Sequence, residues 1–278
     1  RGLALSRGQT DPVSGRNRQA MEFWLQREGI TGICGIDTRH LMQILRRQGS
    51  CRGRISPRPL PPDPDHQDPD TLLMEVSNPE PRRHGSGTPR IGILDCGVKR
   101  GIIQALTRRG AEVWQIPWDA DPSCFPVDGW LLSNGPGDPR NHHHVIDTAR
   151  KLLAGDIPVL GICLGHQIMA LASGTRVYAL PFGHRGHNQP VRMEGSTRAF
   201  LTPQNHGYAV DNAHIPEGWS SWFTNLNDGS NEGLQHTHKP FRSVQFHPEA
   251  SGGPRETGFI FDRFLQDALT HKTRKTQP

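Results

Sequence analysis

The stretch PVLGICLGHQ, residues 158–167, decides the fold of this chain. An apolar run reaches Cys163, which stands between Gly161 and Gly165, and a helical pattern begins immediately behind it. This pattern predicts a strand that turns sharply into a helix, an arrangement that presents a nucleophile on a crowded turn where small neighbours are needed. The start of a helix also favours a thiolate over a thiol. Cys163 is therefore the first candidate for chemistry.

Strands and helices alternate on both sides of this turn. The pattern predicts strands at residues 91–94, 112–116, 129–132 and 158–162, and helices at residues 98–109, 142–153 and 164–173. Strands separated by helices of this length indicate a parallel sheet with right-handed crossovers. After residue 174 the pattern becomes strand-rich and irregular, until a strand at 242–246 and a helix at 256–268. The expected fold is α/β, with an open, mostly parallel sheet and flanking helices.

The sequence outside this region predicts a second, smaller unit. Residues 1–55 contain helical patterns at 18–28 and after Asp37, and a strand at 52–55. Residues 56–89 are rich in proline and polar side chains, which is typical of a linker and connecting segment. The expected boundaries are therefore 1–55, 56–89, 90–270 and a polar tail at 271–278. Because the first residue is Arg1, we expect the chain to begin partway through its first domain.

Composition excludes several classes of function. The chain has 278 residues and a net charge of +5, but its arginines are scattered without interleaved aromatic side chains, so no nucleic-acid partner is expected. Five cysteines, without a CxxC pair, a signal peptide or a long apolar stretch, indicate a reduced, cytoplasmic chain with no membrane partner. The phosphate-binding pattern GxxxxGK[ST] is absent, and no GxGxxG follows a strand, so no nucleotide site is expected.

Two further motifs follow predicted strands, at the edge where open α/β sheets bind ligands. The first is SNGPGDP, residues 133–139, a rigid turn whose backbone N–H groups can approach a ligand. The second is SVQFHPE, residues 243–249, in which near-extended geometry places His247 and Glu249 on one face. A cysteine nucleophile needs a histidine base that a carboxylate orients. Cys163, His247 and Glu249 supply these three groups.

The remaining chemistry-bearing side chains have ordinary interpretations. The N–H groups of Leu164 and Gly137 are candidate donors to a tetrahedral oxyanion. The three histidines at 142–144 are expected at a solvated helix start, and His166 is expected to pack or to form a hydrogen bond. No metal site is expected. The other four cysteines are expected to be ordinary thiols.

Several strings in the sequence resemble a known family. GICLGHQ (161–167) with FHPE (246–249) resembles the class I, or triad, glutamine amidotransferases. Four more strings resemble the small chain of carbamoyl-phosphate synthetase: HRGHNQP (184–190), QNHGYAV (204–210), NDGSNEG (227–233) and GIDTR (35–39). The resemblance implies a flavodoxin-like amidotransferase domain, preceded by the last part of a β-rich domain, in an N-terminally truncated small chain.

The resemblance also implies roles for residues. Cys163 would be the nucleophile, His247 the base and Glu249 its orienter. The glutamine pocket would be lined by Gly135, Gly137, Leu164, Gln167, Asn205, Gly207 and Tyr208. Glutamine would be hydrolysed through a cysteinyl thioester. The ammonia would pass to a large chain, fused or separate, which uses bicarbonate, ATP and Mg²⁺ to make carbamoyl phosphate for pyrimidine and arginine biosynthesis. No cofactor is expected in this chain.

Three alternatives stay open at this stage. The first is an amidotransferase that serves another synthetase, such as those for GMP or anthranilate. The second is a binding or regulatory subunit that keeps the fold without turnover. The third is a γ-glutamyl hydrolase that acts without a partner.

Overall fold

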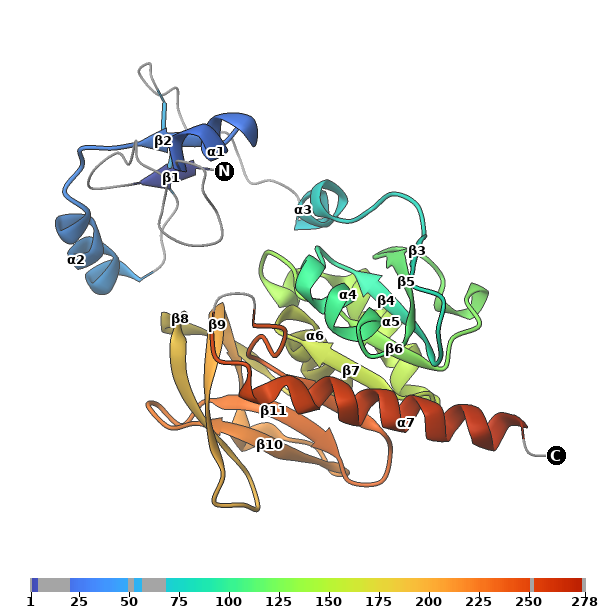
Figure 1. Ribbon diagram of the computed structural model, residues 1–278. Coiled ribbons are helices and arrows are strands. Elements are labelled where there is room, and N and C mark those ends of the chain that lie inside the picture. Colours follow the sequence, from blue (N-terminus) through green and yellow to red (C-terminus); the bar gives the residue numbers. More distant parts are fainter. Residues whose placement is uncertain (1, 5–20, 50–52, 57–68, 251–252, 277–278) are drawn as a thin grey trace. The chain divides into compact units, whose positions relative to one another are not determined.

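The computed structural model describes residues 2–4, 21–49, 53–56, 69–250 and 253–276 (Figure 1). Contacts divide the chain into two units, residues 1–66 and residues 67–278. The domain boundaries expected from the sequence stay a prediction.

The described part of the first unit holds two short strands and two helices. Strand β1 (Gly2–Ala4) pairs in parallel with β2 (Thr31–Ile33), and the helices are α1 (Met21–Arg27) and α2 (Thr38–Gln48). Asp37 caps α2, because its Oδ1 accepts a hydrogen bond from the N–H of His40 at 2.9 Å. The expected strand at 52–55 is not formed over residues 53–55. Helix exceeds strand in this described part, so the β-rich character that the resemblance implied is not seen there.

Five parallel strands form the centre of the second unit. In spatial order they are β12 (Phe241–Val244), β7 (Val159–Ile162), β6 (Gly129–Leu132), β4 (Arg90–Asp95) and β5 (Glu112–Pro117). The helices that accompany them are α4 (Arg100–Thr107), α5 (His143–Ala154), α6 (Leu164–Ser173) and α7 (Phe259–Thr276). Each expected element of this region is present, with ends shifted by a few residues at most, apart from α7, which continues through residues 271–276 of the expected tail.

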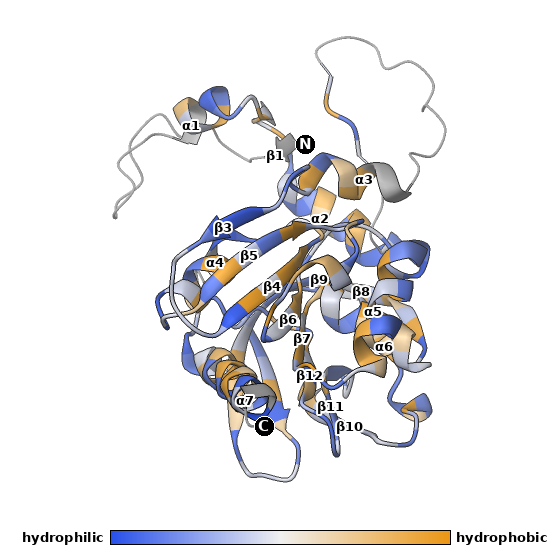
Figure 2. Cartoon of the chain, turned by 90° about the vertical axis from the view of Figure 1, so that its right-hand side faces the viewer, coloured by the Kyte–Doolittle hydropathy of each residue, from blue (hydrophilic) through white to orange (hydrophobic). Residues whose placement is uncertain are grey.

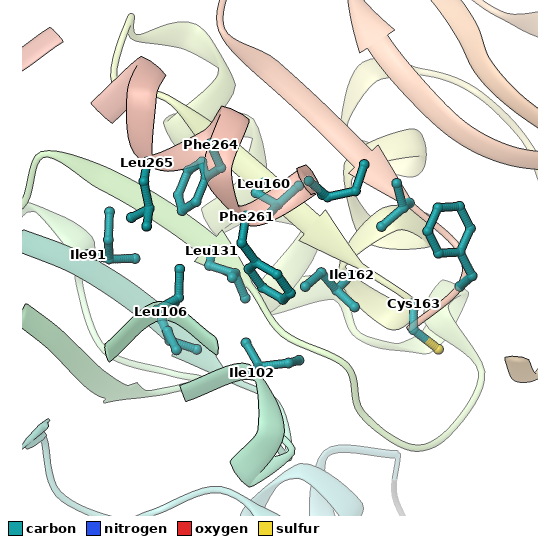
Figure 3. Close-up of a cluster of buried hydrophobic side chains, with 14 of the residues drawn as sticks. Ile91, Ile102, Leu106, Leu131, Leu160, Ile162, Cys163, Phe261, Phe264 and Leu265 are labelled. Carbon is teal, nitrogen blue, oxygen red and sulfur yellow. The ribbon is translucent and has the colours of Figure 1, made fainter. Parts of the chain in front are cut away.

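Both faces of this parallel sheet are covered by helices. Leu131 packs in a cluster with residues of α4 and α7, whereas its neighbours Trp130 and Leu132 pack with residues of α5 and α6. Figure 3 shows the first cluster, with Cys163 at its edge. Strands buried on both faces read as continuous apolar runs. The hydropathy colours in Figure 2 follow this arrangement, because the central strands carry orange segments.

The remaining strands are antiparallel and close on themselves. They are β8 (Val177–Met193), β9 (Ala199–Val210), β10 (Trp219–Asn225) and β11 (Asn231–His236). The spatial order is β10-β8-β9-β11, and β10 also pairs with β11, so the four strands form a closed barrel that joins the sheet through β11 and β12. The expectation of an open, mostly parallel sheet was therefore wrong for this part. Antiparallel strands need only short turns, whereas parallel strands need long crossovers, and the sequence here has no helical crossover.

The expected connecting segment also contains structure. Helix α3 (Pro69–Val76) carries the buried Leu73, and strand β3 (Arg82–His84) pairs antiparallel with β5 at the edge of the sheet. Four short 3-10 helices complete the described elements: η1 (Pro122–Cys124), η2 (Pro139–Asn141), η3 (Asn212–His214) and η4 (Glu256–Gly258). Within the described ranges, no helix has both the length and the apolar character needed to cross a membrane.

Candidate active site

Cys163 lies at the turn between β7 and α6, in a strained backbone conformation. Its φ angle is 55°, a region that residues other than glycine rarely adopt. The N–H of Cys163 donates to the carbonyl oxygen of Val244 at 2.9 Å, which ties the turn to β12. A Cβ atom added at Gly165 would lie 2.0 Å from the carbonyl oxygen of Leu132, and one added at Gly161 would lie 2.6 Å from that of Gly165. The two glycines therefore allow α6 to pack directly against the sheet and hold the turn in place.

His247 reaches the site from the chain beyond β12. The strand ends at Val244, two residues earlier than expected, and the N–H of His247 donates to the carbonyl oxygen of Pro203 at 3.0 Å. The side chain is 5% exposed and its Nδ1 donates to Glu249 Oε1 at 2.7 Å. The spacing of two residues thus brings histidine and carboxylate together, as the sequence predicts. The Cys163 side chain is near enough to this ring to influence its pKa.

The charged side chains around His247 stabilise one another's ionised forms. Burial alone would lower the pKa of His247, but the charge of a Cys163 thiolate, the hydrogen bond to Cys163 and the Glu249 carboxylate raise it to about 9. Burial alone would raise the pKa of Glu249, but the hydrogen bond to His247, the charge of that ring and the charge of Lys99 lower it. Lys99 Nζ lies 3.6 Å from Glu249 Oε1. At neutral pH the arrangement therefore favours an imidazolium between a carboxylate and the sulfur.

The glycine turn lies next to the start of α6. A Cβ added at Gly135 would lie 2.6 Å from Leu164 Cδ2, and Gly137 has a φ angle of 92° that favours glycine. Asn134 anchors the turn, because its Oδ1 accepts from the N–H of Lys99 at 3.0 Å. Leu164 is the first residue of α6, so its N–H belongs to the four that have no acceptor within the helix.

The residues expected to line a glutamine pocket come from two elements besides this turn. Gln167 on α6 donates to the carbonyl oxygen of Tyr208 on β9 at 3.1 Å. Burial, together with the charge of Asp138, raises the pKa of the Tyr208 hydroxyl, so β9 also approaches the glycine turn. Asn205 and Gly207 lie on the opposite face of β9 from Tyr208, by the alternation of an extended strand. Asn205 is exposed and pairs with Arg185 of β8. The structure therefore brings Gln167 and Tyr208 together, whereas the place of Asn205 in a glutamine pocket stays a prediction.

Sequence reasoning missed some neighbours of the site. Lys99 and Asp138 lie far along the chain from the groups they contact, so no motif connects them. His142 was expected in solvent, yet it is buried and its Nε2 lies 3.0 Å from the carbonyl oxygen of Pro136. His166 is buried with Nδ1 2.8 Å from Ser243 Oγ. Burial, helped by the charge of His206, lowers the pKa of His166 to about 3, so His166 is no second base at neutral pH.

Comparisons with known proteins identify the family. The family model for class I glutamine amidotransferases matches residues 92–267, and the model for the CPSase domain of the carbamoyl-phosphate synthase small chain matches residues 1–55. A carbamoyl phosphate synthase small chain of Methanopyrus kandleri is 40% identical over 280 residues, which cover 94% of this chain and 76% of that protein. The arginine-specific small chain of Saccharomyces cerevisiae is 43% identical over 262 residues, and the match covers 90% of this chain and 64% of that protein.

A solved structure shares the fold over most of this chain. It is a putative GMP synthase protein from Thermoplasma acidophilum, with a TM-score of 0.60 and 22% sequence identity. The match covers 70% of this chain and all of that one.

Proposed function

Because this chain belongs to the class I glutamine amidotransferases, within the family of carbamoyl-phosphate synthase small chains, we propose that it hydrolyses glutamine and supplies ammonia to a large chain. The large chain would combine the ammonia with bicarbonate, using ATP and Mg²⁺, to make carbamoyl phosphate for pyrimidine and arginine biosynthesis. A cytoplasmic location fits the free thiols of Cys34 and Cys124, which are exposed.

The geometry supports a thioester mechanism. The Cys163 thiolate attacks the side-chain carbonyl carbon of glutamine, and the N–H groups of Leu164 and Gly137 are our candidate donors to the oxyanion. The His247 imidazolium donates its proton to the amide nitrogen, the C–N bond breaks, and ammonia leaves a γ-glutamyl thioester on Cys163. Neutral His247 then takes a proton from water, and the hydroxide attacks the thioester. The C–S bond breaks, which releases glutamate and restores the ion pair.

One observation carries this proposal. His247, buried at 5% exposure, forms a hydrogen bond with Glu249 and is near enough to Cys163 for the two side chains to interact, and a strained turn holds the sulfur at the start of a helix. A thiol that served only packing would need neither the imidazole nor the strain. Gln167, Leu164 and Tyr208 come from elements that adjoin this turn, which supports a glutamine pocket beside the sulfur.

The test compares Cys163→Ser with Cys124→Ser, an exposed thiol away from the site. We expect Cys163→Ser to abolish ammonia release from glutamine, while the large chain in complex with the variant still makes carbamoyl phosphate from added ammonia. Cys124→Ser should keep both activities. Release of ammonia from glutamine by Cys163→Ser at the normal rate would show that the sulfur is not the nucleophile.

A second measurement separates the proposal from its rivals. Glutaminase activity should rise when the carbamoyl-phosphate synthase large chain is added, because the product is useful only to that partner. Equal activity with and without the large chain would favour a free-standing hydrolase. Absence of activity, with no thioester trapped by a glutamine analogue, would favour a regulatory role without turnover.

A further inference from the structure

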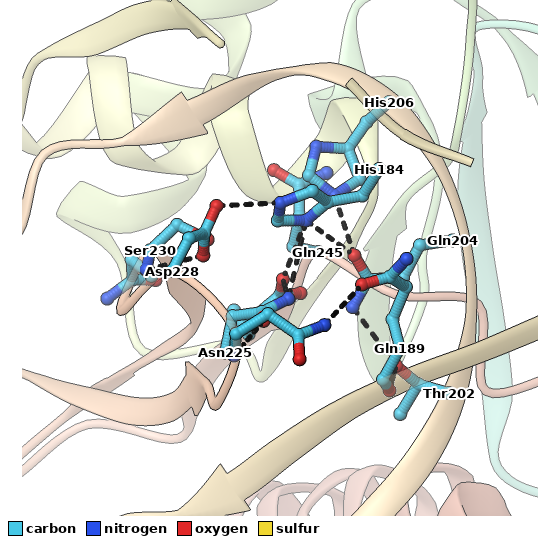
Figure 4. Close-up of polar contacts among 12 residues, drawn as sticks. His184, Gln189, Thr202, Gln204, His206, Asn225, Asp228, Ser230 and Gln245 are labelled. Atoms are coloured by element: carbon cyan, nitrogen blue, oxygen red, sulfur yellow. Dashed lines mark hydrogen bonds and ion pairs between the residues drawn. The ribbon is translucent and has the colours of Figure 1, made fainter. Parts of the chain in front are cut away.

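A second group of buried side chains lies inside the antiparallel barrel. His184 on β8, His206 on β9 and Glu232 on β11 are 9%, 6% and 0% exposed. One ligand-type atom from each lies within 4.8 Å of the other two. Figure 4 shows the two imidazole rings side by side, with the amide of Gln204 facing them. The proposed glutaminase chemistry uses none of these side chains directly.

One of the two polar contacts of the His206 ring joins two acceptor atoms, with no hydrogen between them. Its Nδ1 lies 2.8 Å from the carbonyl oxygen of Tyr208, which can only accept, so Nδ1 carries the hydrogen of a neutral ring. Nε2 then carries a lone pair, yet it lies 2.9 Å from Gln204 Oε1, another acceptor. Rotating the amide moves the conflict elsewhere, because Gln204 Nε2 donates to Thr202 Oγ1 at 3.0 Å and the Thr202 hydroxyl donates to the carbonyl of Gln189 at 2.9 Å.

A doubly protonated His206 does not relieve this conflict at low cost. Deep burial disfavours the charged ring. The ring of His184 lies 4.8 Å away, and it already contacts the carboxylates of Glu232 and Asp228. A cation removes the repulsion when it binds the lone pair of His206 Nε2, the Glu232 carboxylate and Nδ1 of a neutral His184 ring, whose remaining hydrogen stays on Nε2 towards Asp228.

One nitrogen of each ring, His184 Nε2 and His206 Nδ1, has the kind of hydrogen-bond partner that metal-binding histidines have. Such rings almost always donate their other N–H to a carboxylate or a backbone carbonyl. His184 Nε2 lies 2.8 Å from Asp228 Oδ2, and Asp228 is in turn fixed by the N–H and hydroxyl of Ser230 at 3.0 and 2.7 Å. His206 Nδ1 has the carbonyl of Tyr208. The other two nitrogens, His184 Nδ1 and His206 Nε2, therefore both face Gln204 Oε1.

The carboxylate is also arranged as a ligand. Glu232 Oε1 lies 3.3 Å from His184 Nδ1 and accepts from Asn225 Nδ2 at 2.8 Å, whereas the buried Oε2 has no hydrogen-bond partner. An unpaired buried oxygen of this kind costs free energy unless something binds it.

We propose that His184 Nδ1, His206 Nε2 and the Glu232 carboxylate bind a zinc ion, with Gln204 Oε1 at the remaining position. Two imidazoles and one carboxylate are a common donor set for zinc. Tetrahedral zinc with these ligands separates neighbouring donor atoms by about 3.3 Å. Gln204 Oε1 is 2.9 Å from each ring nitrogen, and His184 Nδ1 is 3.3 Å from Glu232 Oε1. The three ligand atoms lie within 4.8 Å of one another, so binding would draw the most distant pair together by up to about 1.5 Å.

The ion would be structural. Four protein ligands close the site, and they join three strands of the barrel: β8, β9 and β11. Strand β9 also carries Tyr208, whose carbonyl contacts both His206 and Gln167. Zinc would therefore fix the strand that we expect to line the glutamine pocket. No metal was expected from the sequence, because the three ligands are separated by 22 and 26 residues and form no spacing motif.

The test measures metal content in the full chain, purified without a metal-affinity step and dialysed against one equivalent of zinc. We expect about one zinc per chain by mass spectrometry, and a melting temperature that falls when a chelator removes the metal. Glu232→Gln should lose the zinc and the effect of the chelator. The matched control is His143→Gln, an exposed histidine in the run at 142–144, which should keep both.

A second variant covers the case in which Glu232→Gln fails to fold. Asp228→Asn changes only the group that holds His184 and should weaken zinc binding roughly 10–100-fold. Cobalt in place of zinc should give the visible bands of a tetrahedral site in the unaltered chain and in His143→Gln. No zinc after dialysis, or zinc lost from His143→Gln and retained in Asp228→Asn, would overturn the proposal and leave a network of hydrogen bonds alone.

Discussion

Cys163, the proposed nucleophile, has a strained backbone conformation. A residue other than glycine at positive φ costs about 1–3 kcal/mol, and such strain persists only where surrounding contacts hold it. Here the holding contacts are the hydrogen bond to Val244 and the tight packing at Gly161 and Gly165. The strain places the sulfur at the start of α6 and within reach of His247. The conformation is therefore best explained by the position of the sulfur.

The first prediction at this scale concerns pH. The pKa of His247 is raised to about 9, so the ring is protonated at neutral pH and loses its proton as the pH rises through that value. The imidazolium is the proposed acid for the leaving ammonia, so kcat/KM for glutamine should fall roughly tenfold per pH unit above about 9. A rate profile between pH 6 and 10.5 measures it, and a constant kcat/KM to pH 10.5 would contradict the proposed acid.

The second prediction concerns Glu249. Glu249→Gln keeps the shape of the side chain but removes the charge that holds the imidazolium and orients His247. We expect kcat/KM to fall roughly 10²–10⁴-fold. The alkaline limb, which is the fall of kcat/KM at high pH, should move to lower pH, because the Glu249 charge no longer stabilises the proton on His247. Glu217→Gln, at an exposed position, is the control and should leave both unchanged. A loss of rate without a shifted limb would indicate that Glu249 acts on folding rather than on the base.

At the scale of elements, the direct packing of α6 on the sheet gives a third prediction. In Gly165→Ala the new Cβ would lie 2.0 Å from the backbone oxygen of Leu132, which cannot move aside as a side chain can. We expect a loss of roughly 1–3 kcal/mol of unfolding free energy, together with a loss of glutaminase rate as the Cys163 turn shifts. Urea denaturation measures the change in the free energy of unfolding.

The control is Gly155→Ala, where the nearest atom to an added Cβ is 3.5 Å away, an ordinary contact. This variant should change the free energy of unfolding by less than about 1 kcal/mol. Equal effects of the two substitutions would show that the close approach of α6 is unimportant.

The parallel strands and the antiparallel barrel differ in how well the sequence predicted them. The parallel strands were predictable because burial on both faces makes them apolar throughout, as at residues 129–132 and 159–162. The barrel was not predictable from the sequence, because its buried positions include the polar residues His184, Gln204 and Glu232. Polar side chains inside a barrel erase the alternation of apolar and polar residues that marks a strand. The barrel therefore read only as an irregular, strand-rich region.

The site was predictable to a similar, limited degree. Residues two apart in an extended chain share a face, so the contact between His247 and Glu249 followed from spacing alone. Lys99 stands 150 positions before Glu249, and Asp138 stands 70 positions before Tyr208. Their contacts arise only when the strands that precede them are aligned in the sheet. No local pattern carries that information.

At the scale of the whole molecule, the two units differ in how much core they possess. Within the described part of residues 1–66, only Leu25 is buried, and Phe23, Trp24 and Met42 are 58%, 41% and 52% exposed. Three clusters of buried apolar side chains lie in the second unit, between Leu73 and Ala268. One buried apolar side chain among the described residues of this unit contributes little towards offsetting the entropy of ordering them.

This difference gives the last prediction, which compares the full chain with two fragments. Residues 67–278 alone should show a cooperative thermal transition within about 2 °C of the main transition of the full chain, because the core lies inside them. Residues 1–66 alone should show no cooperative transition by circular dichroism. The fragment 67–278 should also keep the hydrogen bonds of His247, so its alkaline limb should match that of the full chain, provided that it still turns over glutamine. A cooperative transition in residues 1–66, or an unfolded fragment 67–278, would mean that the stabilising core is distributed differently.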